Sequence, residues 1–276
     1  MLSFRSHSPF TTSKVMREKI ERLVEGFVRE YPVRNRTRTE WESPLVGFAG
    51  ASDPLCTELK GWVSETHFLP GDLRADARTV IVYFIPFNRK TVISNRRGKR
   101  ASVEWAAAYI ETNRLIMELS QHLSGELEKE GFQSALIPPT HNFDEKRLIS
   151  NWSHRHLAWI AGLGTLGLNR MLITEKGCCG RLGSLVTNAS IEPTPRPEKE
   201  YCLFKHDGSC KKCVDHCTYG ALKVDSYDRK RCYEVCLINA ETHAPLGLAD
   251  VCGKCVAAVP CSFKNPLSRK GLGCDP

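Results

Sequence analysis

Hydrophobic and polar positions follow two different periods along the first 190 or so residues of the chain. Apolar residues recur at helical spacing from Ser13 to Glu30, with Ser13 as a candidate N-cap, and from Val103 to Glu130, where Gly131 ends the pattern. Shorter helical patterns cover residues 53–64 and 148–160. Runs rich in Val, Ile, Leu and Phe predict strands at 44–51, 78–86, 132–137, 171–174 and 182–188. Alternating helices and strands predict an α/β (α+β) layered domain.

A proline-bearing stretch, IEPTPRPEKE at residues 191–200, separates this pattern from a different one. Beyond it the chain is dense in cysteine. Clusters of proline between patterned segments are typical of linkers. We therefore predict two domains, residues 1–195 and residues 196–276.

Composition and charge narrow the class of protein. The longest apolar run, Thr79 to Phe87, is far shorter than the roughly 20 residues that a membrane-spanning helix needs. The first residues hold no apolar stretch typical of a signal peptide, so we expect a soluble, cytoplasmic protein without membrane contact. The net charge is +8, and Asn88–Arg100 carries six Lys or Arg and no acid. This segment is either a solvated loop or a contact for an anionic partner, such as a nucleic acid or a phosphate-bearing cofactor tail.

The thirteen cysteines are distributed unevenly. Cys56 is the one that precedes residue 178, whereas eleven lie between Cys178 and Cys261. In a reducing cytoplasm such a concentration indicates metal ligands or catalytic groups in preference to disulfides. The adjacent pair Cys178 and Cys179 is better explained by buried packing than by a strained vicinal disulfide.

The spacing of the later cysteines resembles that of a ferredoxin. Cys210 to Cys217 reads C-x2-C-x3-C, the last part of the bacterial run C-x2-C-x2-C-x3-C. Asp207 stands where the first cysteine of that run belongs, and Cys202 is the available substitute. In ferredoxins the last cysteine of each run ligates the other cluster. This rule assigns one 4Fe–4S cluster to Cys202, Cys210, Cys213 and Cys261, and a second to Cys217, Cys232, Cys252 and Cys255.

Two alternatives remain for these cysteines. Cys236 competes with Cys232 for the second cluster. A structural zinc site would also fit two C-x2-C pairs, but it uses four cysteines, and this segment offers nine. The prediction is therefore two iron–sulfur clusters.

The glycine-rich stretch AGLGTLGLN has the G-x-G-x-x-G spacing of a dinucleotide site at Gly162, Gly164 and Gly167. A predicted helix precedes it and a predicted strand follows it, which is the reverse of a Rossmann turn. Instead, Ser153 to Asn188 resembles the core of the epoxyqueuosine reductase and reductive dehalogenase superfamily, with an A-x-x-AGLG-x-x-G-x-N-x-L segment. The matching residues are Ala158, Ala161, Gly162, Leu163, Gly164, Gly167, Asn169, Leu172 and Ile173.

The resemblance covers roughly Leu45 to Cys261. It implies a nitroreductase-like, cobalamin-binding-type domain followed by a small bacterial ferredoxin-like two-cluster domain. It also implies an epoxyqueuosine reductase-like oxidoreductase, with a ferredoxin or flavodoxin type of protein as its electron donor. The residues that it implies for corrinoid binding are Ala161, Gly162, Leu163, Gly164, Gly167, Asn169 and Arg181.

The chain departs from the family at the proton donor. The acidic residue of epoxyqueuosine reductases, about thirteen residues before the alanine of AGLG, would fall on Leu148. The candidates that replace it are Asp144, His154 and His156, because carboxyl and imidazole groups transfer protons near neutral pH. The two histidines lie on different faces of the predicted helix, and each also suits a capping or core role. His141, on the same loop as Asp144, completes a second candidate set.

These observations predict an iron–sulfur oxidoreductase that passes electrons through two 4Fe–4S clusters to a bound cobalamin and reduces a small or nucleoside-like substrate. The alternatives are a corrinoid-free electron-transfer protein and a reductive activator of a partner's corrinoid. The first predicts a roomy cavity between the domains. The second predicts that side chains fill it, and the third predicts an open face beside the nearer cluster.

Overall fold

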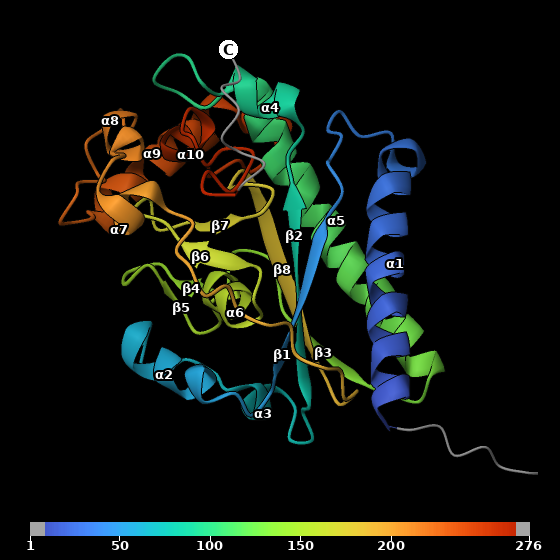
Figure 1. Cartoon of the computed structure of the whole chain (residues 1–276). Coiled ribbons are helices and arrows are strands. Elements are labelled where there is room, and N and C mark those ends of the chain that lie inside the picture. Colours follow the sequence, from blue (N-terminus) through green and yellow to red (C-terminus); the bar gives the residue numbers. More distant parts are fainter. Residues whose placement is uncertain (1–8, 269–276) are drawn as a thin grey trace, which may run out of the picture.

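A four-stranded antiparallel sheet forms the centre of the fold in the computed structural model, which describes residues 9–268 (Figure 1). Its strand order is β1 (Leu45–Gly50), β2 (Thr79–Pro86), β8 (Gly180–Thr187) and β3 (Ser134–Leu136). All residues of β2 are buried, as its unbroken apolar run requires, because helices cover both faces of the sheet.

Two long helices, α1 (Pro9–Asn35) and α5 (Val103–Lys129), cover one face (Figure 1). Ser102 caps α5 by accepting a hydrogen bond from the backbone N–H of Trp105. Apolar residues at helical spacing on α5, Leu115, Leu119 and Leu123 among them, are fully buried against α1 and the sheet.

Shorter elements cover the other face. They include α2 (Pro54–Trp62), α3 (Pro70–Leu73), α6 (His154–Ile160), the hairpin of β4 (Phe143–Asp144) with β5 (Ile149–Ser150), and the pair of β6 (Gly164–Leu166) with β7 (Leu172–Thr174). Their apolar side chains form a second core with the sheet, in which Leu157, Ala158 and Val186 are fully buried.

The cysteine-rich segment consists mostly of short helices. They are α7 (Leu203–Asp207), α8 (Lys212–Asp215), α9 (Arg229–Thr242), the 3-10 turn η1 (Ala244–Leu246) and α10 (Lys254–Ala257). A third core joins this segment to Phe87 and Trp105 of the sheet domain and to α4 (Arg89–Ser94). Residues on both sides of the predicted boundary near residue 195 thus share one core. Over the described range, no helix is long and apolar enough to cross a membrane.

The mixed α/β architecture predicted from the sequence is confirmed, with three local corrections. The first helix begins at Pro9, so Ser13 lies inside it, and its hydroxyl accepts a hydrogen bond from the backbone N–H of Glu192 (2.7 Å). The helix predicted from residue 148 begins at His154, because residues 149–150 pair in β5. The glycine-rich stretch contains strand β6, where we expected only a turn.

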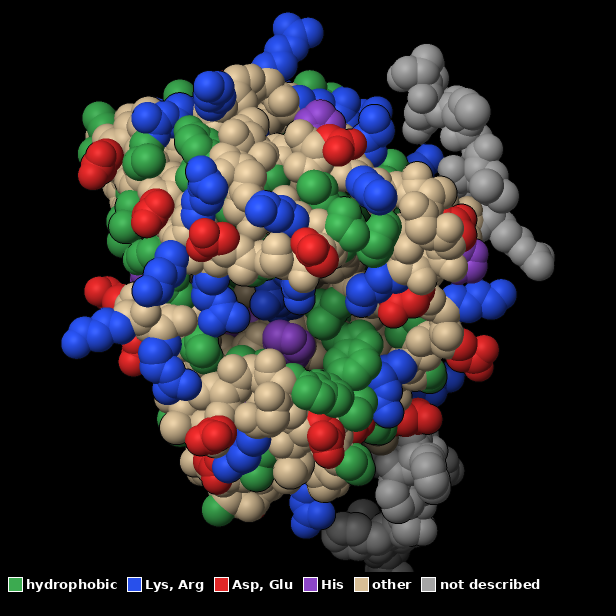
Figure 2. All heavy atoms as spheres, turned by 90° about the vertical axis from the view of Figure 1, so that its left-hand side faces the viewer, with side chains coloured by type: hydrophobic (Ala, Val, Ile, Leu, Met, Phe, Trp, Pro, Cys, Tyr) green, Lys and Arg blue, Asp and Glu red, His purple; other side chains and the backbone are tan. Residues whose placement is uncertain are grey.

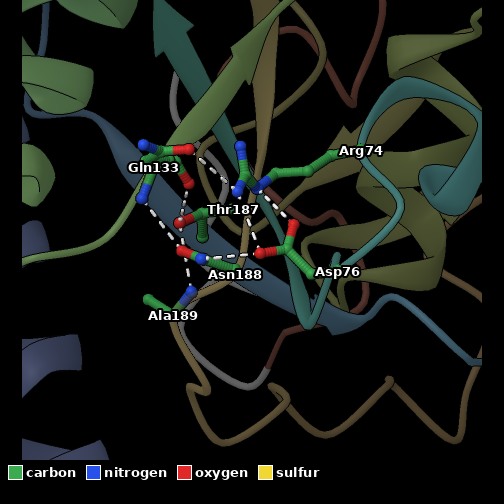
Figure 3. A network of polar contacts seen from close by, with 6 residues as sticks. All are labelled: Arg74, Asp76, Gln133, Thr187, Asn188 and Ala189. Atoms are coloured by element: carbon green, nitrogen blue, oxygen red, sulfur yellow. Dashed lines mark hydrogen bonds and ion pairs between the residues drawn. The ribbon is translucent and has the colours of Figure 1, made fainter.

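A polar network closes one end of the sheet (Figure 3). Arg74 donates hydrogen bonds to Asp76 (2.9 Å) and to the side-chain oxygen of Gln133 (3.1 Å). Asn188 donates to Asp76 (2.9 Å), and its side-chain oxygen accepts from the backbone N–H of Gln133 (2.9 Å). The hydrogen bonds from Arg74 and Asn188 lower the pKa of the Asp76 carboxyl. The network therefore joins the loops at the ends of β2, β3 and β8.

Candidate functional site

The first predicted set of cysteines lies around one small cavity. Cys202, Cys210, Cys213 and Cys261 all line it, although 59 positions separate the first from the last. The backbone N–H of Leu168 donates to the sulfur of Cys202 (3.5 Å). The cavity therefore contains the four residues that the ferredoxin rule groups together.

The second set lines a larger cavity of about 420 Å³ between the sheet domain and the cysteine-rich segment. Its cysteines are Cys217, Cys232, Cys236, Cys252 and Cys255. The backbone N–H of Leu222 donates to the sulfur of Cys217 (3.3 Å). Both competitors for the fourth position are therefore present at this cavity.

Helix α9 places Cys232 and Cys236 one turn apart, and Asp228 caps its first turn. A hydrogen bond with the Cys236 thiol lowers the pKa of Cys232 to about 6, against the effect of burial. The hydrogen bond with Cys232 and burial raise the pKa of Cys236. Cys232 is thus the thiolate of the pair, and Cys236 is the thiol that donates to it.

Three polar side chains of this cavity, Tyr109, Arg181 and Asp250, form a group with His141, which lies outside the cavity lining. The hydroxyl of Tyr109 donates to Asp250 Oδ1 (2.7 Å), and His141 Nε2 lies 3.2 Å from Asp250 Oδ2. The guanidinium of Arg181 stacks over the ring of Tyr109, 4.4 Å from its centroid. Burial raises the pKa of Tyr109, and Arg181 partly offsets this rise. The group can hold and move a proton, because phenol, carboxylate and imidazole are in direct contact.

Sequence reasoning found only part of this group. Arg181 was predicted as a cofactor ligand, and His141 belonged to the second candidate set. Tyr109 and Asp250 were missed, because one lies within a long amphipathic helix and the other in a loop of the cysteine-rich segment. The nearest signal is the position of Asp250, two residues before Cys252.

His154, predicted as a catalytic candidate, lies in the core instead of at the cavity. Its Nδ1 is 2.8 Å from the hydroxyl of Ser184 on β8, and its Nε2 is 2.9 Å from the carbonyl oxygen of Pro138. Burial lowers its pKa to about 4. The side chain is therefore a neutral imidazole that joins α6 to the sheet and to the loop after β3.

The other two catalytic candidates also lie away from the cavity walls. His156 Nδ1 is 2.7 Å from the hydroxyl of Ser153, and burial lowers the pKa of this histidine to about 4. Asp144 is exposed, and its carboxylate accepts the backbone N–H groups of Lys146 (2.9 Å) and Arg147 (2.8 Å) in the turn of the β4–β5 hairpin. The structure thus gives both side chains local structural partners and does not bring the three candidates together.

Of the seven residues predicted to bind a corrinoid, Asn169 and Arg181 line the larger cavity. Ala161, Gly162, Leu163, Gly164 and Gly167 do not. Gly164 has a φ of +159°, and a Cβ there would lie 1.9 Å from the carbonyl oxygen of Ile173 on β7. Gly162 likewise faces the carbonyl oxygen of Pro195 in the linker. These glycines permit close backbone contacts within the protein, which only a residue without a side chain allows.

The basic segment Asn88–Arg100 supports the second cysteine set. The side-chain amide of Asn95 donates to the carbonyl oxygen of Cys252 (2.9 Å). Lys254 in turn donates to the carbonyl oxygens of Asn95 (2.9 Å) and Arg97 (2.7 Å). The segment therefore has a structural role in holding α10, while several of its cations stay exposed.

The cysteines outside these sets differ in their surroundings. Cys178 and Cys179 are buried, and Cys178 Sγ lies 3.9 Å from Cys261 Sγ. Cys56 is buried in the second core, and burial raises its pKa to about 12. Cys274 lies outside the described residues.

Within residues 9–268, no three His, Cys, Asp or Glu side chains form a group that could hold a single metal ion.

The fold is shared with solved structures of two kinds of enzyme. One is an epoxyqueuosine reductase crystallised with an epoxyqueuosine-modified tRNA-Tyr stem loop, at 21% identity and a TM-score of 0.53 over 88% of this chain and 66% of that one. The other is a reductive dehalogenase whose structure suggests a mechanism for B12-dependent dehalogenation, at 15% identity and a TM-score of 0.57 over 82% of this chain and 31% of that one.

Sequence comparison gives the same relationship. The chain is 28% identical to the epoxyqueuosine reductase of Bacillus anthracis over 169 residues, which are 59% of this chain and 41% of that protein. It thus matches about two fifths of the length of this curated relative. No family model matches the chain. The predicted resemblance to this superfamily is confirmed.

Proposed function

We propose that the chain is an iron–sulfur oxidoreductase that uses two 4Fe–4S clusters and a bound cobalamin to reduce a small or nucleoside-like substrate. One observation carries this proposal. A single cavity is lined by the second cysteine set and by Tyr109, Arg181 and Asp250, and His141 contacts Asp250 from outside the lining. Electron-transfer ligands and a proton-transfer group thus line the same space. The similarity to enzymes named epoxyqueuosine reductase supports an oxidoreductase.

The cysteine sets fit two clusters, which supply single electrons when bound. Cys202, Cys210, Cys213 and Cys261 would hold the first, and Cys217, Cys232, Cys252 and Cys255 the second. We assign Cys232 in preference to Cys236, because the hydrogen bond from the Cys236 thiol stabilises Cys232 as a thiolate, the form that binds iron. The backbone N–H groups of Leu168 and Leu222 point at ligand sulfurs, as donors that tune cluster potentials do.

The cavity also fits part of a large cofactor. Its volume of about 420 Å³ lies in the range of small-molecule sites, and Phe87, Trp105, Phe143 and Met171 give it apolar walls. Among the described residues, the buried indole N–H of Trp105 has no hydrogen-bond partner and is therefore a donor for a ligand. Cobalamin would supply a strongly nucleophilic low-valent cobalt there, and Asn169 and Arg181 line the space that it would enter.

The polar group provides the proton that a reduction consumes. Asp250 is 8% exposed in its side chain, and it contacts both the exposed His141 and the buried Tyr109. A proton can therefore pass from solvent to His141, to Asp250, and to the phenol that lines the cavity. Arg181 over the ring of Tyr109 stabilises negative charge on the phenol oxygen after it has donated.

The electron donor is proposed to dock beside the first cluster. Arg96, Lys212 and His216 line a surface hollow that includes Pro260, the neighbour of Cys261. A basic surface next to a ligand cysteine suits an acidic ferredoxin or flavodoxin type of partner, since opposite charges steer association.

The two alternatives make different demands on the cavity. A corrinoid-free relay needs space only for the second cluster, whereas the reductase also needs apolar walls and a proton-transfer group beside it, and this cavity has both. A reductive activator of a partner's corrinoid uses the same cysteines, but its own chain takes up no cobalt.

The proposal is tested by anaerobic purification, iron–sulfur reconstitution, and measurement of iron, sulfide and cobalt with and without added cobalamin. We expect about eight iron atoms per chain, one cobalt per chain and a perturbed corrinoid spectrum. A full complement of iron with no cobalt uptake would overturn the corrinoid assignment and leave a relay or an activator.

A further inference from the structure

Three arginines from three separate elements line the outer part of the large cavity. Arg155 extends from α6, Arg170 from the loop before β7, and Arg229 from the first position of α9. Arg170 and Arg229 are exposed and Arg155 is half-buried. Figure 2 shows Lys and Arg side chains gathered around a hollow on this side of the molecule. We call these three residues the arginine rim.

The three arginines of the rim line one cavity, and their charges act on one another. Burial is the main cause that lowers the pKa of Arg155, and the charges of Arg229 and Arg170 lower it further. Within the described part of the chain, none of the three forms an ion pair, and the one side-chain hydrogen bond of Arg229 goes to the carbonyl oxygen of Arg147 (3.5 Å). Three like charges thus line one opening with no carboxylate paired to them.

No acid of the cavity neutralises the rim. Asp250 is the only carboxylate among the described residues that line this space, and it is already bonded to Tyr109 and His141. The group whose charge acts most on Arg155 is Tyr227, ahead of the other two arginines.

The backbone conformation of Arg170 also indicates a ligand site. Arg170 has a φ of +64°, a left-handed conformation that residues with a Cβ rarely adopt. Its N–H bonds the carbonyl oxygen of Gly167 (3.0 Å), which fixes this tight turn. Strained backbone of this kind concentrates at ligand sites, where the side chain must be aimed in one direction.

We propose that the arginine rim binds an anionic oxygen group, a carboxylate or a phosphate, on the molecule that enters the cavity. Guanidinium groups bind both anions through paired, charge-assisted hydrogen bonds. The anion belongs either to the substrate or to the phosphate-bearing tail of the corrinoid. The inference deepens the proposed function and rests on it for the reaction, but binding of the anion itself is measurable without turnover.

The first experiment measures binding of inorganic phosphate to the reconstituted full-length chain by calorimetry at constant ionic strength. Arg155→Gln should weaken binding about tenfold, as expected for loss of a charge-assisted hydrogen bond. The phosphate affinity of Arg155→Lys should lie between those of the unaltered chain and Arg155→Gln, because lysine keeps the charge and loses the forked geometry. Arg231→Gln, the control, makes the same charge change on α9 at an exposed residue that does not line the cavity, and should bind as the unaltered chain does.

Uptake of two corrinoids, cobalamin and cobinamide, then shows whether the bound anion belongs to the corrinoid tail or to the substrate. If the tail is the source, Arg155→Gln weakens uptake of cobalamin about tenfold and leaves uptake of cobinamide, which lacks the phosphate, unchanged. If the substrate is the source, Arg155→Gln changes neither uptake while phosphate binding still weakens. Equal phosphate binding by the unaltered chain, Arg155→Gln and Arg231→Gln, or no phosphate binding by any of them, overturns the proposal. Failure of the proposed function would instead appear as absent cobalt uptake with the phosphate difference intact.

Discussion

The sheet domain and the cysteine-rich segment are stabilised in different ways. In the sheet domain, every residue of β2 is buried, and buried polar groups such as Tyr83 and Ser120 pair with each other. In the other region, α9 buries only Val235 and Asn239, and α7, α8 and α10 have four or five residues each. Helices this short are not stable by themselves. The first region therefore depends on apolar burial, and we infer that the second depends on what its cysteines bind.

The largest effect should come from Cys255→Ser, which removes a half-buried ligand of the proposed second cluster. We expect iron to fall from about eight to about four atoms per chain, because one cluster is lost. Iron and sulfide analysis after reconstitution measures this. Cys56→Ser is the matched control, a buried thiol of the sheet domain that should leave the iron content unchanged. Unchanged iron in Cys255→Ser would remove this cysteine from the ligand set.

A change that should lower stability without changing the iron content is Leu119→Ala, in the core between α1, α5 and the sheet. Because Leu119 is fully buried, the free energy of unfolding should fall by about 2–5 kcal/mol. Iron per folded chain should not change. Met117→Ala, on the same helix but 51% exposed, should shift stability by less than about 0.5 kcal/mol. Urea unfolding followed by circular dichroism makes the comparison, and equal effects of the two variants would contradict the assigned core.

A pH effect of intermediate size should come from His154. Its pKa in the folded protein is about 4, below the ordinary 6.5, so the unfolded chain binds a proton first as pH falls. The stabilising contribution of the neutral imidazole is complete above pH 6.5 and is lost progressively between pH 6.5 and pH 4. The full change is about 3 kcal/mol. Urea titrations at pH 7 and pH 4.5 should show this loss in the unaltered chain and a smaller one in His154→Gln. Identical pH dependence of the two would exclude this role.

The smallest effect should come from the network at the end of the sheet. Asp76 is held ionised by Arg74 and Asn188, so its contribution is present above its ordinary pKa and is lost as pH falls below it. Asp76→Asn should lower the melting temperature slightly at pH 7, and the unaltered chain and the variant should converge near pH 3. Visible absorption of the reconstituted protein should not change, since the network is remote from both cysteine sets. A change in that spectrum would show that the two regions are coupled.

The sequence predicted those parts of the molecule that depend on local pattern. Strand β2 and helix α5 were found because their apolar residues follow one period without interruption. The residues of each predicted cysteine set line one cavity, and their role as cluster ligands stays a prediction. The boundary at residue 195 and the nitroreductase-like and ferredoxin-like details stay predictions.

What depends on long-range packing was not predicted. Tyr109 and Asp250 are 141 positions apart, and no local pattern joins them. For His154, the helical period did not reveal whether the imidazole faces the cavity or the sheet, because this depends on how α6 docks against Ser184 of β8. For the glycines, spacing showed that a close approach occurs but not that the approaching group is the protein's own backbone.

Trp105 gives the chain an optical property of its own. A Cβ at Gly253, between Cys252 and Cys255, would lie 2.2 Å from the ring of Trp105, so this indole lies directly against the turn that carries both sulfurs. Iron–sulfur clusters absorb across the near-ultraviolet and visible range, where tryptophan emits. Energy transfer at such short range extinguishes fluorescence. If the second cysteine set holds a cluster, as proposed, the emission of this one of the five tryptophans should be quenched when the cluster is present and should recover when it is removed.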